Sequence, residues 1–319
     1  MEPPKYTIVV NTYPYKERGT DLVRCLNSLF SQTYQTFCIL LIENYKNSSQ
    51  INKLIETYSK EKSRITLLVD QTKKLSFLFN LGWKNSKTEY LAYIADDAEA
   101  DKNWLFSINE ELSREETGVV TGPVISTSFP AGEMHRLFLL SQKNTYFKIL
   151  SFPYLHFAME DNVLQPGKLF ESGAYSIGAG LEQSKDYPRQ EIDLATTTSM
   201  GIKKTVLMKV NGFDEHFNFN HADGDLFLRI KQAGFKIIFT PKVKALHHVR
   251  IGPSRNAYFI GKDTALFYKK HIRPKSLDGL IGALLNIMLL NFYWVYATLK
   301  TKDLKQLKGI SGFLEGLFS

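Results

Sequence analysis

The sequence predicts an α/β fold built on a mostly parallel sheet with helices on both faces. Between residues 6 and 98, short runs of apolar and β-branched residues alternate with segments whose apolar residues recur at helical spacing. The connections between these segments are short, which is typical of parallel βαβ units. With 319 residues, 44% of them hydrophobic, the chain is long enough for one large domain, or one domain with an appendage.

The predicted strands are apolar almost throughout, as expected for strands that are buried on both faces. The first covers residues 6–10 (YTIVV) and the second covers 37–44 (FCILLIEN). The third covers 64–70 (RITLLVD) and the fourth covers 90–98 (YLAYIADDA).

Three helices are predicted between these strands. In the first, at 20–32, apolar residues stand at positions 22, 23, 26, 29 and 30, and Thr20 and Asp21 are candidate caps. The second helix is expected at 49–61, and the third at 75–86, ending near Asn85.

Acidic residues crowd the end of the fourth strand, where Asp96, Asp97, Glu99 and Asp101 follow one another. Glu43 ends the second strand, and a polar turn at residues 12–18 follows the first. In sheets of this kind ligands bind outside the carboxyl ends of the strands. A divalent cation such as Mg²⁺ or Mn²⁺ would relieve the crowding and bridge to a phosphate. A solvated acidic loop that caps the next helix explains the same residues.

Three segments together resemble the family 2 glycosyltransferases, which have the GT-A fold. The first is VVNTYPYKERGTDLVRCLNSLFSQTYQTFCILLIEN and the second is LSFLFNLGWKNSKTEYLAYIADDAEADKNWL. The third, far downstream, is MGIKKTVLMKVNGFDEHFNFNHADGDLFLRIKQAGFKIIFTPKVKALHHV. Any one of them is a weak match, but three in order over most of residues 6–250 are a specific one. The resemblance implies a GT-A nucleotide-diphospho-sugar transferase fold.

The resemblance implies a donor site in the first half of the chain. Thr12 and Tyr13 match the turn after the first strand, and Asn80 matches the N-x-G motif. Glu43 stands where the family usually has Asp and would contact the base or ribose. Asp96 would face the ribose.

A metal site and a catalytic base are also implied by the resemblance. Asp97 would bind Mn²⁺ or Mg²⁺ on the donor diphosphate, and His247, with His248 as the fallback, would complete that site. Asp223 matches the general base. Two departures stand beside these residues, because Ala95 and Ala222 replace acids of the family pattern.

Glycosyl transfer from such a donor needs a neutralised diphosphate, a deprotonated acceptor hydroxyl and exclusion of water. Direct displacement uses one carboxylate as base, and no second, nucleophilic carboxylate stands out, so we expect inversion at the anomeric carbon. Two alternatives remain. Asp223 and Asp225 precede LFLRIKQAGF, so either could be a helix N-cap only. The chain could also be a catalytically silent nucleotide- or glycan-binding relative of the same fold.

We divide the chain into a glycosyltransferase domain, 1–272, and a C-terminal helical segment, 273–319. Within the domain, residues 1–124 form the nucleotide-binding half and 125–272 the acceptor and catalytic half. Residues 125–195 match the family least, and we expect them to shape the acceptor side. GFDEHF (212–217) is expected to be a turn in which Gly212 adopts a positive φ.

The C-terminal segment contains twenty-one uncharged residues, 279–299, with basic residues on both flanks. The length matches a bilayer span, but its asparagines and tyrosines favour a helix that lies in the membrane interface or docks on the domain. Ordinary soluble packing or a dimer contact is the third possibility, and the oligomeric state is open. A membrane surface fits a glycan or a lipid-linked saccharide as acceptor.

The remaining features exclude several classes of protein. The net charge is +8, but the basic residues are spread along the chain without a nucleic-acid-binding motif, so we expect no nucleic acid partner. Cys25 and Cys38 form no cluster with histidines, which argues against a structural zinc site. The N-terminus lacks the pattern of a signal peptide. We therefore expect a cytoplasmic protein, peripheral on the inner face of the cell membrane.

Overall fold

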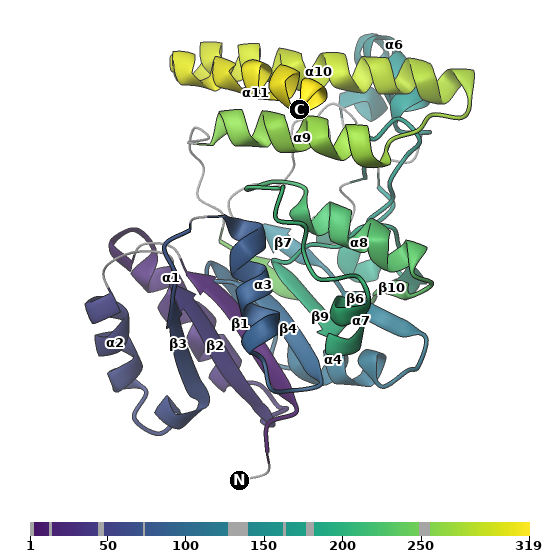
Figure 1. Ribbon diagram of the computed structural model, residues 1–319. Helices are drawn as coiled ribbons and strands as arrows, with labels where there is room; N and C mark the ends of the chain where they lie inside the picture. The colour runs from purple at the N-terminus through teal and green to yellow at the C-terminus, as the bar shows by residue number, and fades with distance from the viewer. Residues whose placement is uncertain are drawn as a thin grey trace.

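The computed structural model describes residues 3–12, 15–43, 48–72, 74–126, 140–161, 164–176, 182–248 and 256–319. It consists of a lower α/β layer and an upper layer of helices (Figure 1). The main sheet has eight strands in the order β3-β2-β1-β4-β9-β6-β10-β8. Its strands are β3 (Ile65–Val69), β2 (Phe37–Glu43), β1 (Tyr6–Thr12), β4 (Tyr90–Ala95), β9 (Ser199–Lys203), β6 (Thr117–Thr121), β10 (Lys236–Phe239) and β8 (Gln190–Glu191).

The first half of the sheet is parallel and the second half is mixed. Strands β3, β2, β1 and β4 all run in the same direction. Strand β9 is antiparallel to both β4 and β6, and β8 is antiparallel to β10. A smaller sheet, β5-β11-β7, contains β5 (Ala98–Ala100), β11 (Ala245–His247) and β7 (Val124–Ser126). The predicted α/β class, with a mostly parallel sheet, is confirmed.

Helices cover both faces of the main sheet because its strands are apolar on both sides. Ile8 and Val10 of β1 pack against α1 (Tyr15–Phe30), α2 (Ser48–Thr57) and α4 (Trp104–Leu112). Val9, whose side chain points to the opposite face, packs against α3 (Leu75–Asn85), α7 (Lys204–Lys209) and α8 (Ala222–Gln232). This alternation is the reason that the strand is one continuous apolar run.

The first helix differs from its prediction. Helix α1 begins at Tyr15, so Thr20 and Asp21 lie inside it and are not its caps. Asp21 instead forms an ion pair with Arg24 at 3.2 Å. The apolar spacing in the sequence identifies only the buried face of a helix. A polar first turn does not contribute to this spacing, so the start of α1 was predicted too late. The expected turn at 212–217 is confirmed: Gly212 has φ +64°, and a Cβ there would meet Trp83 and Asn80.

The upper layer consists of α9 (Ala257–His271), α10 (Leu277–Thr301) and α11 (Lys308–Phe318), with α6 (Thr145–Pro153) beside them (Figure 1). Glycines let these helices approach closely. A Cβ at Gly312 would meet the carbonyl of Tyr258 on α9, and one at Gly282 would meet the carbonyl of Phe157. Helix α9 therefore packs with the C-terminal helices, although it precedes residue 273, where the C-terminal segment was expected to begin.

Candidate functional site

Unpartnered polar atoms gather at the carboxyl ends of β1 and β2. The side-chain amide of Asn11, the hydroxyl of Thr12 and the Oε2 atom of Glu43 are buried without a hydrogen-bond partner among the described residues. Thr12 and Glu43 are paired in register. A buried polar group without a partner costs roughly 1–3 kcal/mol, and a bound ligand would offset this cost. Burial raises the pKa of Glu43. Tyr13 lies outside the described residues.

The structure brings Asp97 and His247 together from positions 150 residues apart. Asp97 follows β4, and His247 ends β11, which pairs with β5 directly after the acidic turn. His247 Nε2 lies 3.1 Å from Asp97 Oδ1, and the amide of His248 donates a hydrogen bond to the carbonyl of Asp97. Both Asp97 and Asp96 are buried.

The four acids of the turn do not converge. Glu99 contacts His248 Nε2 at 3.2 Å, and Asp101 accepts a hydrogen bond from the amide of Asn103 at the start of α4. Glu99 and Asp101 therefore have structural partners, as the interpretation as a helix-capping loop predicts. A cation site at Asp96 and Asp97 stays a prediction.

Asp223 lies in the first turn of α8, after His221, which has φ +58°. Its Oδ1 atom accepts a hydrogen bond from the amide of Gly224 at 2.9 Å. Burial raises the pKa of Asp223, although the amides of Gly224 and Thr197 act in the opposite direction. The carboxyl group is thus poised to accept a proton.

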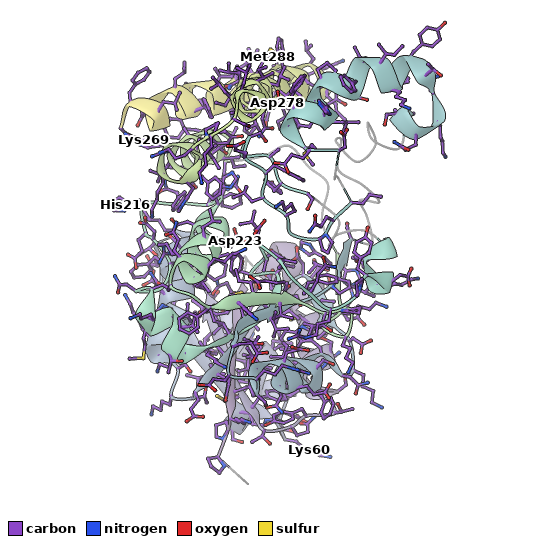
Figure 2. All side chains as sticks on the ribbon, turned by 90° about the vertical axis from the view of Figure 1, so that its right-hand side faces the viewer. Lys60, His216, Asp223, Lys269, Asp278 and Met288 are labelled. Carbon is purple, nitrogen blue, oxygen red and sulfur yellow. The ribbon has the colours of Figure 1, made fainter. Side chains whose placement is uncertain are left out.

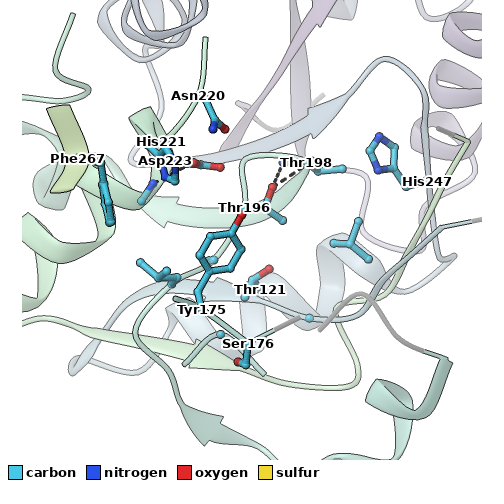
Figure 3. A pocket seen from close by; sticks show the side chains of 16 residues that line it. Thr121, Tyr175, Ser176, Thr196, Thr198, Asn220, His221, Asp223, His247 and Phe267 are labelled. Atoms are coloured by element: carbon cyan, nitrogen blue, oxygen red, sulfur yellow. Dashed lines mark hydrogen bonds between the residues drawn. The ribbon is translucent and has the colours of Figure 1, made fainter. Parts of the chain in front are cut away.

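One cavity of about 390 Å³ is lined by both Asp223 and His247. Asp223 lies on one side of it and His247 on the other (Figure 3). Its walls are completed by residues from several loops, including Thr121, Tyr175, Ser176, Thr196, Thr198, Asn220, His221 and Phe267. We call this cavity the catalytic cleft. Among the described residues that line it, Asp223 is the carboxylate.

His221, Tyr175, Thr196 and Thr198 line the cleft and were missed from the sequence. The His221 ring stacks on Phe267 with centroids 4.7 Å apart, and burial lowers its pKa to about 4, so it is neutral at pH 7. The carbonyl of Thr198 accepts a hydrogen bond from Ala95. Two features of the sequence could have indicated these residues. His221 stands two positions before Asp223, and the polar ATTT segment at 195–198 directly precedes β9.

Asn80, like Glu43 and Asp97, does not line the catalytic cleft, and its expected role in donor binding stays a prediction. Its side-chain amide donates to Phe213 O and to Glu215, and its Oδ1 atom accepts from the Phe213 amide and from Trp83. All of its donors and its acceptor are used to hold the 212–217 turn against α3. This was not visible in the sequence because the partners are about 135 residues away.

The N-cap interpretation of Asp223 and Asp225 is wrong, because His221 occupies the N-cap position of α8. Asp225 is fully buried and pairs with two cations and a histidine. Its carboxylate contacts Arg229 at 2.7 Å, Lys270 at 2.6 Å and His271 at 2.8 Å. Burial alone would raise the pKa of Asp225, but these partners lower it overall. It therefore links α8 to α9 and has a structural role.

The two alanines that replace family acids are accommodated differently. Ala222 is buried in the apolar cluster formed with Leu226 and Phe227 of α8. A carboxylate at this position would be desolvated among these side chains. Ala95 ends β4, and its backbone amide donates a hydrogen bond to the carbonyl of Thr198.

The residues around Asp97 fit a hard divalent cation that also binds a ligand. Within the described ranges, no group of three or more His, Cys, Asp or Glu side chains is arranged to hold a metal ion. Asp97 and His247 supply one carboxylate and one imidazole. Mg²⁺ and related ions are commonly held by one or two carboxylates, with water and substrate phosphates completing the coordination. The donor set fits such a shared site.

The architecture is that of the GT-A glycosyltransferases. GalNAc-T7, solved with UDP, GalNAc and Mn²⁺, matches 84% of this chain and 48% of its own, with a TM-score of 0.61 and 14% identity. The S. aureus protein TarS 1-349 with UDP-GlcNAc matches 98% of this chain and 81% of its own, with a TM-score of 0.60 and 12% identity. A mannosyltransferase from Pyrobaculum calidifontis with GDP-Man and Mn²⁺ matches 100% and 88%, with a TM-score of 0.57 and 14% identity.

The model of the family "Glycosyl transferase family 2" matches residues 7–178, more than half of the chain. The chain therefore belongs to glycosyl transferase family 2, a family of glycosyltransferase enzymes. It is 25% identical over 248 residues to the O-antigen biosynthesis protein RfbC of Myxococcus xanthus. This match covers 77% of the chain and 17% of that much longer relative.

Proposed function

We propose that the chain is an inverting glycosyltransferase that moves a sugar from a nucleotide-diphosphate donor to a glycan or a lipid-linked saccharide. The observation that carries the proposal is the placement of Asp223 and His247 on opposite sides of one cavity, with the Asp97 carboxylate 3.1 Å from His247 Nε2. A nucleophile activated at one side and a leaving diphosphate held at the other are what a direct displacement requires.

The donor is assigned to the sheet edge formed by β2, β1 and β4. Glu43 and Thr12 carry unpartnered buried atoms there, and Asp96 follows on the next strand. Neighbouring strands lie about 4.8 Å apart, so this edge is long enough for a nucleoside. The solved relatives that bind UDP-GlcNAc and GDP-Man share the fold and support a nucleotide sugar as donor.

Asp223 acts as the general base in this mechanism. It takes the proton from the acceptor hydroxyl as the oxygen attacks the anomeric carbon, and the diphosphate leaves on the opposite face. A raised pKa brings a carboxylate closer to the pH at which it works, which favours this role. Inversion follows from a single displacement, and Asp223 is the carboxylate among the described residues lining the cleft.

Mn²⁺ or Mg²⁺, held by Asp97 and His247, would neutralise charge on the leaving diphosphate. The complexes of two solved relatives contain Mn²⁺, which supports this choice. The ring of His221 is neutral, so it adds no positive charge to the acceptor side of the cleft. It therefore forms no ion pair with the carboxylate of Asp223.

We further propose that the enzyme is cytoplasmic and peripheral on the inner face of the cell membrane. Helix α10 is long and apolar enough to cross a membrane, and 28% of its most apolar window is buried inside the protein. Its exposed apolar residues recur every three or four positions and so form one stripe. The stripe consists of Leu277, Leu280, Leu284, Met288, Phe292, Val295 and Leu299, and the exposed Tyr293 and Tyr296 lie on the same helix.

The stripe faces away from the catalytic cleft. Figure 2 shows Met288 at the outer surface of the helical layer and Asp223 between the two layers. Helix α6 adds further exposed apolar side chains, among them Tyr146, Ile149 and Leu150. A helix with one face packed on protein and the other apolar and exposed fits an interfacial position better than a span.

Calorimetric binding of UDP, GDP and dTDP tests the donor site. Wild type and Asp97→Ala are titrated with each nucleotide, with and without Mn²⁺. We expect metal-dependent binding of one nucleotide that is lost in the variant. If no nucleotide binds to wild type under any condition, the chain is the silent relative. Binding that leads to no release of free nucleotide from the matching nucleotide sugar, even by slow hydrolysis, would also favour that alternative.

A further inference from the structure

A second cavity, of about 350 Å³, adjoins the catalytic cleft. It lies between the upper helices and the loop at 218–221 that precedes Asp223, which we call the catalytic loop. Its walls come from α9, α10, α11 and the π-helical turn Tyr154–Ala158. Its lining is mainly apolar and aromatic, including Met159, Leu290, Trp294 and Phe313. We call it the apolar cavity. Tyr175, Asn220 and His221 line both cavities, so the two are neighbours across these three residues.

The polar groups in the wall of the apolar cavity bond to one another. The Tyr154 hydroxyl donates to Asn286 Oδ1 at 2.9 Å, and Asn286 Nδ2 donates to the Tyr268 hydroxyl. Tyr268 in turn donates to the carbonyl of Ser172 at 3.2 Å. Because these groups are satisfied, the cavity offers few partners for ordered water, which needs two to four.

An empty apolar cavity destabilises a protein, because the side chains around it lose contacts and burial. The cavity walls here include helices α9, α10 and α11, and the opposite surface of α10 carries the exposed apolar stripe. The cavity therefore lies between the catalytic cleft and the apolar outer face of the helical layer. An aliphatic chain that is attached to an acceptor saccharide would fill the cavity while its sugar reaches Asp223.

We propose that the apolar cavity binds the aliphatic chain of a lipid-linked acceptor. This inference rests on the proposed function, because the chain matters only if a hydroxyl on the attached saccharide enters the catalytic cleft. It goes beyond that function by assigning a binding site and a chemical class of ligand to the interface between the helical layer and the catalytic loop.

Fluorescence quenching of Trp294 tests the proposal directly, since its side chain lines the cavity and is buried. The probes are alkyl β-glucosides with four to twelve carbons and a terminal bromine, each used below its critical micelle concentration. We expect the affinity to rise roughly three- to fourfold per methylene until the cavity is full, and then to stay constant. Trp294→Phe should abolish the quenching, because Trp83 and Trp104 lie elsewhere.

A cavity-filling variant separates the cavity from the outer face of the same helix. Leu290→Phe narrows the cavity, and we expect it to weaken binding of the longest glucoside by about tenfold or more. Leu284→Phe makes the same change on the exposed face of α10 and should leave the affinity unchanged. Equal affinity in Leu290→Phe and wild type, or affinity that keeps rising with chain length, would overturn the proposal.

Nucleotide binding, measured by calorimetry on the same samples, separates this inference from the proposed function. If wild type binds nucleotide in a Mn²⁺-dependent way but binds no glucoside, the proposed apolar-chain site is overturned and the proposed function is not. Saturable glucoside binding without any nucleotide binding would leave a chain-binding site but contradict the transferase function on which its role depends. Because the chain-length series uses wild-type protein, it does not depend on the folding of a variant.

Discussion

Asp223 occupies an environment that a purely structural carboxylate would not need. Burial disfavours its charged form, while the amides of Gly224 and Thr197 favour it. Asp225, two positions later in the same helix, has Arg229, Lys270 and His271 as partners and a lowered pKa. The contrast between these neighbours supports the proposed role of Asp223 as a base and a structural role for Asp225.

Removal of the Asp223 carboxylate should abolish most of the activity. We expect Asp223→Asn to reduce kcat/KM by about 10²–10⁴-fold, the usual contribution of a general base. In wild type, activity should fall at low pH with an apparent pKa above 3.8, the ordinary value for Asp. Initial rates across pH measure both effects. The exposed Asp278→Asn is the control, and a wild-type rate in Asp223→Asn would remove Asp223 from the mechanism.

The same substitution should increase stability at neutral pH. A carboxyl group whose pKa is raised by folding stabilises the protein below its unfolded pKa, and this contribution is lost as pH rises through the folded pKa. Asparagine cannot ionise, so Asp223→Asn should unfold at higher denaturant concentration than wild type at pH 7. The difference should shrink as pH falls toward 3.8.

Asp225→Asn provides the comparison of opposite sign, since the pKa of Asp225 is lowered in the folded state. This variant should be destabilised at pH 7, and its deficit should decrease at low pH. Denaturant unfolding at several pH values measures both variants. A loss of stability at pH 7 in Asp223→Asn would contradict the assigned environment.

At the scale of elements, α9 positions the loop that precedes α8. The carboxylate of Asp263 is fully buried and accepts hydrogen bonds from the backbone amides of Asn218, Phe219 and Asn220, at distances of 2.7–3.1 Å. The Asp225 ion pairs join α8 to the other end of α9. The upper helices therefore support the catalytic loop as well as covering it.

Replacement of Asp263 should loosen this loop. Asp263→Ala leaves three backbone amides without their acceptor, and we expect a loss of about 3 kcal/mol in the free energy of unfolding. Hydrogen–deuterium exchange should accelerate at residues 218–221 more than in the strands of the main sheet. The matched control is Asp303→Ala, at the start of the turn before α11. Unchanged exchange at 218–221 would show that the loop does not depend on α9.

At the scale of the whole molecule, the helical layer has two different surfaces. One packs onto the catalytic domain, and the other carries the apolar stripe of α10 together with exposed residues of α6 (Figure 1). Exposed apolar patches of this kind mark sites of protein or membrane interaction. Binding to a membrane through this stripe, as proposed, would orient the enzyme with the catalytic cleft on the side away from the membrane.

Vesicle flotation tests this orientation. Wild type should float with vesicles that contain anionic lipid, because the apolar stripe is flanked by lysines. The double variant Leu284→Glu and Met288→Glu should remain at the bottom of the gradient. Met208→Glu is the control, since Met208 and Leu284 are both 62% exposed but Met208 belongs to α7 in the α/β layer. Equal flotation of all three proteins would contradict membrane binding through α10.

The sequence by itself determined the class of fold and predicted a candidate site. Buried strands are apolar and helices are periodic, so β1 to β4 and α1 to α3 could be placed from local pattern alone. The carboxyl ends of parallel strands meet at one edge, which is why Glu43 and Asp97 could be assigned to a common site.

Only the tertiary structure decided which of these groups meet. The contact between Asp97 and His247 depends on the pairing of β11 with β5, and periodicity carries no information on such long-range partners. For the same reason the hydrogen bonds of Asn80 to the 212–217 turn and the position of His221 in the cleft could not be predicted from the sequence. The apolar cavity arises where three helices from the end of the chain cover the catalytic loop, so its shape depends on packing that no single segment encodes.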